Sequence, residues 1–386
     1  MNMTNKQVAL LVAIVLIVGT IWRLETNHTR QGDRARGAAL TEEIPVLPPT
    51  NIASTSGAAA QDAALAQAAT VARRARKAAA YPPAREIVPG GAFMNSTPFH
   101  LKDFIGNKVI LLDFWTYSCI NCQRTTPYLN AWYEKYRDQG FLIVGVHTPE
   151  FEFEKVYDNV LKNTRDLGIA YPVVQDNDSA TWRTYENQFW PHEYLIDIDG
   201  YIVHDHVGEG GYDETERAIQ AALKERGDVL GVHDRISDAL TTPTNTITLD
   251  PAGVQSPETY FGAARNEYLG NGTRSTTGPQ QLSLPTTTHA NRVYLDGNWN
   301  FQDEYARSES AGTNIIYTYH AKNVYLVASG DAPVPITVMV DGVVTDHQVI
   351  REHKLYPLVH GTEYGTHTLR IQIDTPGLTA YTLTFG

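Results

Sequence analysis

Cysteine is scarce in this sequence: the 386 residues contain two, Cys119 and Cys122, which stand three positions apart. Two cysteines cannot form the disulfide network that supports small secreted folds, so any bridge between them is local. The chain is 42% hydrophobic and 19% charged, which is ordinary for globular material that buries real cores. The role of the cysteine pair is therefore either chemical or minor.

Basic residues are also outnumbered, because 31 Lys and Arg stand against 43 Asp and Glu and the formal net charge is −12. The sequence has no long basic stretch that could neutralise phosphates. This charge balance argues against nucleic acid as a partner.

A charge-free apolar run of fifteen residues, 8–22, follows Lys6 near the start of the sequence. At about 1.5 Å per residue it is slightly short for a hydrocarbon core of ~30 Å, and it suits a signal sequence or a short anchor. No A-x-A cleavage site directly follows, and Trp22 with Arg23 resembles an interfacial end, so we expect an uncleaved anchor over residues 1–24. Counting the arginines after the run would place the rest of the chain in the cytoplasm, but we expect it outside, in the compartment where a reactive cysteine pair can meet disulfides.

Beyond the anchor, the composition and hydrophobic pattern of the sequence change three times. Residues 25–87 are rich in Ala and Pro and predict a linker, whose middle, 58–80, could be helical or could bind a partner. Residues 88–227 alternate strand and helix patterns, which indicates an α/β domain. A polar linker follows at 228–255, and residues 256–386 alternate apolar and polar positions between turn residues, which predicts an all-β, jelly-roll-like sandwich.

The α/β segment reads as strand, helix, strand, helix, strand, helix, strand, strand, helix. The first two predicted strands are 108–117 and 141–148, with a helix at 122–140 between them, and the next two helices are predicted over 152–168 and 179–189. The last two strands, 193–199 and 201–208, are joined at a glycine as a hairpin.

Neither metal interpretation of the cysteine pair fits the sequence. A zinc site needs two further ligands, and no second Cys pair or suitably spaced His pair follows. Covalent haem attachment needs His after the second Cys, where this chain has Gln123. The position of the pair between a strand and a helix is more informative, because a helix N-terminus stabilises a thiolate at Cys119. Cys122, one turn later, could then attack a mixed disulfide formed by Cys119.

The stretch "LLDFWTYSCINCQRTTP" resembles the active site of the thioredoxin family. The resemblance implies that Asp113, six residues before Cys119, is a buried carboxylate with a raised pKa that moves the proton of Cys122. It also implies that Pro191 in "FWPHEYLIDIDG" is a cis-proline facing the cysteines, and that Trp115, Trp190 and Pro191 shape a substrate groove.

More narrowly, "GAFMNSTPFHLKDFIGNKVILLDFW" resembles the TlpA/ResA-like branch, and "GVHTPEFEFEK", "FWPHEYLID" and "SPETYFG" resemble the extracytoplasmic part of DipZ-type proteins. Those proteins join a thioredoxin domain to a sandwich similar to a carbohydrate-binding module. The resemblance implies a membrane-anchored thiol–disulfide oxidoreductase that reduces disulfides of client proteins, as in cytochrome c maturation. Its cofactor would be the Cys119–Cys122 disulfide itself. Because this chain lacks the multi-helix membrane domain of DipZ-type proteins, electrons would come from a separate membrane donor of the CcdA type.

Other assignments stay open at this level. The domain could instead be a thiol peroxidase, or a non-catalytic scaffold in an envelope or carbohydrate-binding protein. Glu150, with His147, stands at a strand end near the cysteines and could handle protons. His204 and His206 alternate on one strand face, which is more often structural. Six aromatic residues of the last domain could stack on sugars or fill a sandwich core: Tyr294, Trp299, Phe301, Tyr305, Tyr317 and Tyr319.

Overall fold

The computed structural model describes residues 55–244, 246–247, 250 and 252–386. The predicted anchor at 8–22 lies outside these residues, and within them no helix has the length and apolar character needed to cross a bilayer. Both folded domains described below lie in one compact unit, 67–386.

An alanine-rich helix, α2 (Thr55–Ala80), precedes the first domain. Alanine has the highest helix propensity, which explains a helix with few apolar contacts of its own. Near its end, Arg73 donates to Asp199 through Nε at 2.6 Å, and Lys77 is ion-paired with Asp197 and Glu225. The end of the predicted linker is therefore tied to the folded domain.

The first domain has a six-stranded sheet in the order β1-β4-β3-β2-β5-β6. The three strands β2, β3 and β4 run parallel, while β5 and β6 form an antiparallel hairpin at one edge and β1 pairs antiparallel with β4 at the other. The strand bounds are β1 (Phe93–Met94), β2 (Val109–Trp115), β3 (Phe141–His147), β4 (Val173–Gln175), β5 (His192–Ile196) and β6 (Ile202–Val207). The predicted hairpin and strand order are thus present.

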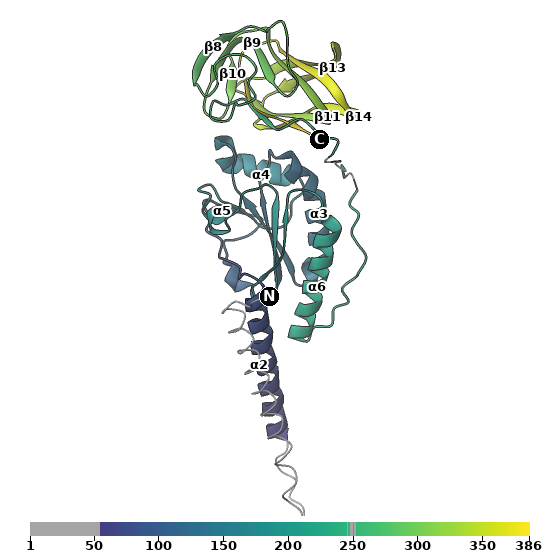
Figure 1. The fold of residues 1–386 in the computed structure, drawn as a ribbon. Coiled ribbons are helices and arrows are strands. Elements are labelled where there is room, and N and C mark those ends of the chain that lie inside the picture. Colours follow the sequence, from purple (N-terminus) through teal and green to yellow (C-terminus); the bar gives the residue numbers. More distant parts are fainter. Residues whose placement is uncertain (1–54, 245, 248–249, 251) are drawn as a thin grey trace, which may run out of the picture. The chain divides into compact units, whose positions relative to one another are not determined.

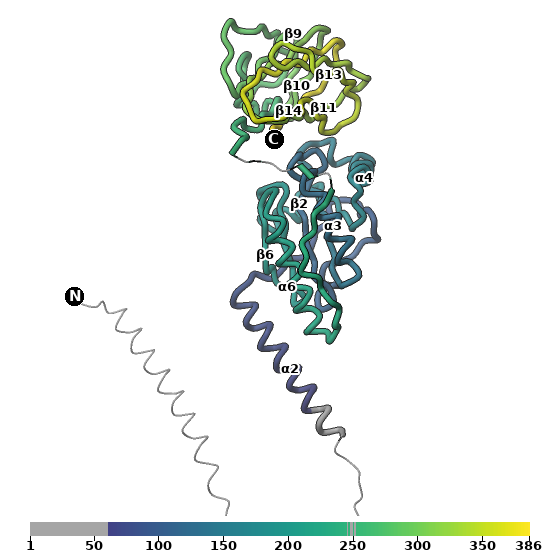
Figure 2. The backbone as a smooth tube through the Cα atoms, turned by 90° about the vertical axis from the view of Figure 1, so that its right-hand side faces the viewer, coloured from purple at the N-terminus to yellow at the C-terminus, as the bar shows by residue number. Residues whose placement is uncertain are grey.

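Alternate residues of the central strand β2 face different layers. Leu111 packs in a cluster with residues of α3 (Ile120–Tyr136), α4 (Tyr157–Asp166) and α6 (Tyr212–Leu230). Leu112 and Phe114 pack in a second cluster with the segment around β1 and with residues near α5 (Ala180–Thr184). Both α3 and α6 lie alongside the sheet in the two views (Figures 1 and 2).

Two predicted helices are shorter in the structure than the sequence pattern suggests. The segment 152–168 divides into the 3₁₀ helix η3 (Glu152–Lys155) and α4, because Val156 adopts an extended backbone. The other, predicted over 179–189, ends at Thr184, and Glu186 follows with a φ of 55° that no α-helix accommodates. The remaining short 3₁₀ helices are η1 (Leu101–Asp103) and η2 (Arg137–Gln139).

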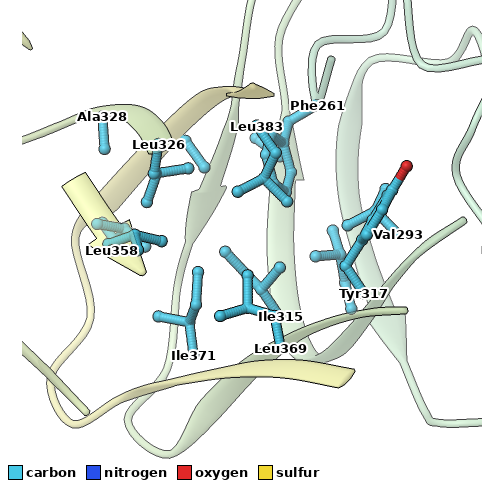
Figure 3. Close-up of a cluster of buried hydrophobic side chains, with 14 of the residues drawn as sticks. Phe261, Val293, Ile315, Tyr317, Leu326, Ala328, Leu358, Leu369, Ile371 and Leu383 are labelled. Atoms are coloured by element: carbon cyan, nitrogen blue, oxygen red, sulfur yellow. The ribbon is translucent and has the colours of Figure 1, made fainter. Parts of the chain in front are cut away.

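The C-terminal domain is all-β, which confirms that part of the sequence prediction, while its jelly-roll-like sandwich form stays a prediction. Its nine strands form one continuous sheet with bounds β7 (Thr259–Tyr260), β8 (Gly278–Leu282), β9 (Val293–Phe301), β10 (Ala306–Ser308), β11 (Thr313–Gly330), β12 (Val334–Val340), β13 (Val343–Ile350), β14 (Lys354–Ile373) and β15 (Leu378–Phe385). The long strand β11 pairs with β9 through its first half and with β15 through its second. The sheet therefore curls around a dry core that includes Ile315, Leu326 and Leu383 (Figure 3).

Five of the six aromatic residues considered for sugar stacking are buried: Tyr294, Trp299, Phe301, Tyr317 and Tyr319. Tyr305 is partly buried and packs against Tyr381. The core of the all-β domain, rather than a sugar-binding platform, therefore accounts for the five.

Candidate active site

Cys119 stands at the N-cap of α3, where β2 has ended and the backbone is still extended. Its Sγ accepts the backbone N–H of Cys122 at 3.4 Å and lies 3.9 Å from the carbonyl oxygen of Trp190. Both cysteines are free thiols, Cys119 partly exposed and Cys122 buried. The helix N-terminus supplies the partial positive charge that favours an anionic sulfur at Cys119.

The environment of Cys122 is different, since its side chain is only 2% exposed. Burial raises the pKa of the Cys122 thiol well above its ordinary value, and the neighbouring Cys119 and Asp113 add to that rise. At neutral pH, Cys122 therefore keeps its proton unless a nearby group takes it.

Asp113 lies in β2 and points toward the layer that holds α3. It is 2% exposed, and burial raises the pKa of its carboxyl to about 7. Its Oδ1 has no hydrogen-bond partner among the described residues. The proton-accepting role of Asp113 stays a prediction, but its burial and raised pKa suit it.

Trp190 lies beside Cys119, and the peptide bond between Trp190 and Pro191 is cis, as the resemblance implied; that Pro191 faces the cysteines stays a prediction. The Trp190 ring rests on Trp182 with centroids 4.3 Å apart, and its Nε1 donates to the carbonyl of Thr148. Trp115 was also expected in the groove, but it is 1% exposed and packs edge-on against His147. Since the side chain of Trp115 points into the core, it cannot contact a substrate.

Glu154 is a buried residue that the sequence analysis missed. Its Oε1 accepts from the Ser118 hydroxyl at 2.6 Å and from the Ser118 N–H, and its Oε2 accepts from the N–H groups of Glu150 and Phe151. Burial raises the pKa of Glu154 to about 7, while these donors favour the ionised form. Glu154 thus fixes the loop immediately before Cys119. The sequence "EFEFEK" repeats Glu at every second position, so it does not show that Glu154, and not Glu150, is the buried acid beside the cysteine loop.

Glu150 itself is bonded to side chains of the second domain. Its Oε1 accepts from Arg265 Nη1 at 2.7 Å and from the Tyr260 hydroxyl at 2.8 Å. His147 is fully buried, and burial lowers its pKa to about 3, so its ring is neutral. The structure therefore gives Glu150 an ion pair with Arg265 of the second domain, and its proton-handling role stays a prediction.

Residues of both domains line a cavity of about 360 Å³ that reaches Cys119. Cys119, Phe189 and Trp190 line it from the first domain, and Tyr260, Arg265 and Phe385 line it from the second. Phe189 is 51% exposed, so the rim carries an apolar contact surface. A chain segment entering the cavity would meet Cys119 and not Cys122.

Comparison with known proteins agrees with this geometry. Residues 106–202 match a family described as "Thioredoxin-like", and residues 256–386 match one described as "Thioredoxin like C-terminal domain". Thiol-disulfide oxidoreductase YkuV of Bacillus subtilis is 30% identical over 124 residues, which cover 32% of this chain and 83% of that protein. The chain belongs to the thioredoxin-like superfamily.

Two further relatives refine the position of this thioredoxin-like protein. Thiol-disulfide oxidoreductase ResA of Bacillus thuringiensis is 32% identical over 126 residues, covering 32% of this chain and 66% of that protein. Protein DipZ of Mycobacterium tuberculosis is 37% identical over 298 residues, or 75% of this chain. This thioredoxin-like protein spans 40% of the length of that DipZ. The predicted resemblance to ResA-like and DipZ-type proteins is confirmed.

Proposed function

We propose that this chain is a thiol–disulfide oxidoreductase that reduces disulfides of client proteins through Cys119 and Cys122. The observation that carries the proposal is the unequal placement of the two thiols. Cys119 lines the cavity at the start of a helix, whereas Cys122 is buried and feels the charge of Asp113, whose Oδ1 has no hydrogen-bond partner among the described residues. This difference supports attack by Cys119 from outside and resolution by Cys122 from inside.

The reaction proceeds in two exchanges. The Cys119 thiolate attacks one sulfur of the client disulfide, forms a mixed disulfide and releases the other client sulfur as a thiolate. Cys122 then loses its proton to Asp113 and attacks Cys119 Sγ, which closes the Cys119–Cys122 disulfide and releases the second client sulfur. The client gains two electrons, and the protein's dithiol is oxidised.

The cavity between the domains is where the client enters in this proposal. Phe189 offers an exposed ring, and the carbonyl of Trp190 next to Cys119 offers an acceptor for an extended chain. The names of YkuV and ResA support the reaction class. We further propose that residues 8–22 anchor the protein with its body outside the cytoplasmic membrane, and that a CcdA-type membrane protein returns the electrons.

Cysteine variants test the mechanism. Cys122→Ser should attack a disulfide-bonded client and stall as a mixed disulfide, because the resolving thiol is gone. Cys119→Ser should lose reduction altogether and trap nothing, which makes it the matched control. Alkylation of the reduced protein near neutral pH should modify Cys119 before Cys122. Faster alkylation of Cys122, or full activity in both serine variants, would refute the proposal.

Topology needs its own experiment. Reporter enzymes that work only outside the cytoplasm, fused near residue 85, should be active in cells, and the protein should stay in the membrane fraction. A reporter active only in the cytoplasm, or a mature protein that lacks residues 8–22, would refute the anchored arrangement.

A further inference from the structure

A second buried acid lies directly opposite Asp113. In the antiparallel pairing of β2 with β5, Asp113 is in register with Glu193. Directly paired residues of antiparallel strands project to the same face with Cβ atoms roughly 4.5–5.5 Å apart. Glu193 is 1% exposed and Asp113 is 2% exposed, so neither carboxyl reaches solvent.

No cation neutralises this pair: within the described part of the chain, neither Asp113 nor Glu193 forms an ion pair. Oδ1 of Asp113 and Oε2 of Glu193 also have no hydrogen-bond partner there. Two carboxylates so close together in a low-dielectric site cannot both be ionised at modest cost. The arrangement therefore favours a state in which the two groups hold a proton between them.

Neighbouring strand β3 leaves space for hydrogen-bond donors beside the pair. Gly145 is in register with Asp113 on the side away from Glu193, and a Cβ there would lie 2.9 Å from Trp115 Nε1 and 3.3 Å from the Tyr171 ring. Trp115 Nε1 and the Tyr171 hydroxyl are themselves buried without partners in the described structure. Because Gly145 has no side chain, the two neutral donors Trp115 and Tyr171 can pack beside the strand position that pairs with Asp113.

The other groups that face the pair come from the elements packed on it. Cys122 approaches from α3, and the charge of Asp113 contributes to the raised pKa of its thiol. From α6, Thr215 favours the ionised form of Glu193 and also bonds Nε2 of His204 in β6 at 3.1 Å. His206 in β6 is in register with Glu193, and its buried Nε2 has no partner among the described residues.

We propose that Glu193 and Asp113 form one buried carboxyl pair that keeps a single shared proton while Cys122 is a thiol and accepts a second when Cys122 attacks the mixed disulfide. The pair then carries one negative charge before the step and none after it. The electron pair of the Cys122 sulfur forms the new bond with Cys119, the bond between Cys119 and the client sulfur breaks, and the negative charge leaves on the released client thiolate. Glu193 acts through Asp113 and is a positioning residue. The proposal rests on the proposed function only for its last step, because the sharing of the proton is a property of the resting protein.

The direction of the pKa changes agrees with this geometry. Burial raises the pKa of Glu193 well above its ordinary value, and the charge of Asp113 raises it further. Two carboxyls that share a proton lose their protons in two steps that belong to the pair and not to either residue.

The decisive experiment titrates the isotope-labelled carboxyl groups of the reduced, full-length protein by NMR. In the wild type, the signals of Asp113 and Glu193 should both follow the same two steps. Asp113→Asn should leave Glu193 with one step, displaced by about one pH unit or more below the second wild-type step, because the like charge is gone. Asp205→Asn removes an exposed acid of β6 and is the matched control, which should leave both steps in place. A Glu193 signal that titrates in one step and ignores Asp113→Asn would overturn the proposal.

A second readout follows the resolution step alone, in single-turnover release of a client from its mixed disulfide with Cys119. Glu193→Gln should remove the alkaline step from the pH profile of this rate, whereas Glu193→Asp, which keeps the carboxyl, should retain it. An unchanged profile in Glu193→Gln would overturn the role in proton transfer even if the carboxyls titrate together. If the wild type fails to reduce any disulfide, the proposed function fails, but the titration of the resting protein still decides whether the proton is shared.

Discussion

The two faces of β2 are equally buried but carry different kinds of side chain. On the face toward α5, Leu112 and Phe114 pack among apolar and aromatic neighbours. The face toward α3 also holds apolar residues, yet Asp113 interrupts it and meets Glu193 across the sheet. The difference teaches that one face serves stability alone, whereas the other gives up stability to place ionisable groups under a reactive thiol.

The largest effect should come from breaking the apolar face. Phe114 is fully buried and contacts the rings of Tyr185 and Tyr194 at 5.5 and 5.7 Å between centroids. Phe114→Ala should lower the free energy of unfolding by about 3–5 kcal/mol, since it removes a large side chain and leaves a cavity. Chemical denaturation measures this, and the preference of alkylating reagents for Cys119 over Cys122 should persist. A loss of that preference in the folded variant would show that the two faces are not independent.

A smaller loss should follow from Glu154→Gln, which changes a buried acid whose oxygens are satisfied. Because each carboxylate oxygen of Glu154 accepts N–H or O–H donors, the amide group of Gln would place its own N–H₂ against some of them. We expect unfolding to become easier by about 1–3 kcal/mol at pH 8, measured by denaturation. Glu152→Gln, at an exposed neighbour, should change stability by less than about 0.5 kcal/mol. Equal effects of the two variants would contradict this account.

Asp113→Asn should raise the free energy of unfolding, by an amount similar to or smaller than the loss expected for Glu154→Gln. The folded-state pKa of Asp113, about 7, lies above the ~3.9 of an unfolded chain, so the wild type loses stability as pH rises from about 4 to 7 and stays lower above it. The variant cannot ionise, so it should exceed the wild type by on the order of 1–3 kcal/mol at pH 8 and by nothing near pH 4. Thermal unfolding of both proteins at pH 4 and pH 8 tests this expectation. The rate at which the Asp113→Asn variant reduces a client disulfide should be lower than that of the wild type. A variant less stable than the wild type at pH 8 would show that the acid contributes to folding.

Local sequence patterns were sufficient for much of the fold and for part of the site. The strand and helix order of the first domain, the cysteine pair and Asp113 follow from residues close together in the chain. Glu193 could not be selected, because its importance comes from cross-strand pairing with a residue eighty positions earlier. Likewise, a motif places Trp115 near the cysteines but does not say which way its side chain points, and the alternation of β2 turns it into the core.

Residues of the second domain were missed for the same reason. Arg265 and Tyr260 have no local pattern that marks them, and they reach Glu150 across more than a hundred residues of sequence. The buried acid Glu154 differs from Glu150 because the turn of η3 brings the Glu154 carboxylate back to the N–H of Glu150.

The cavity at Cys119 is lined by two domains that are separate segments of the sequence, and this has an evolutionary consequence. In the proposed mechanism the reacting groups lie around the cysteine pair, whereas Tyr260, Arg265 and Phe385 line the cavity from the other domain. If the proposed function holds, we expect mutations of these three residues to change which clients are accepted more than they change the rate of disulfide exchange. Drift in client preference would be less constrained here than in a thioredoxin fold whose recognition loops also support the nucleophile.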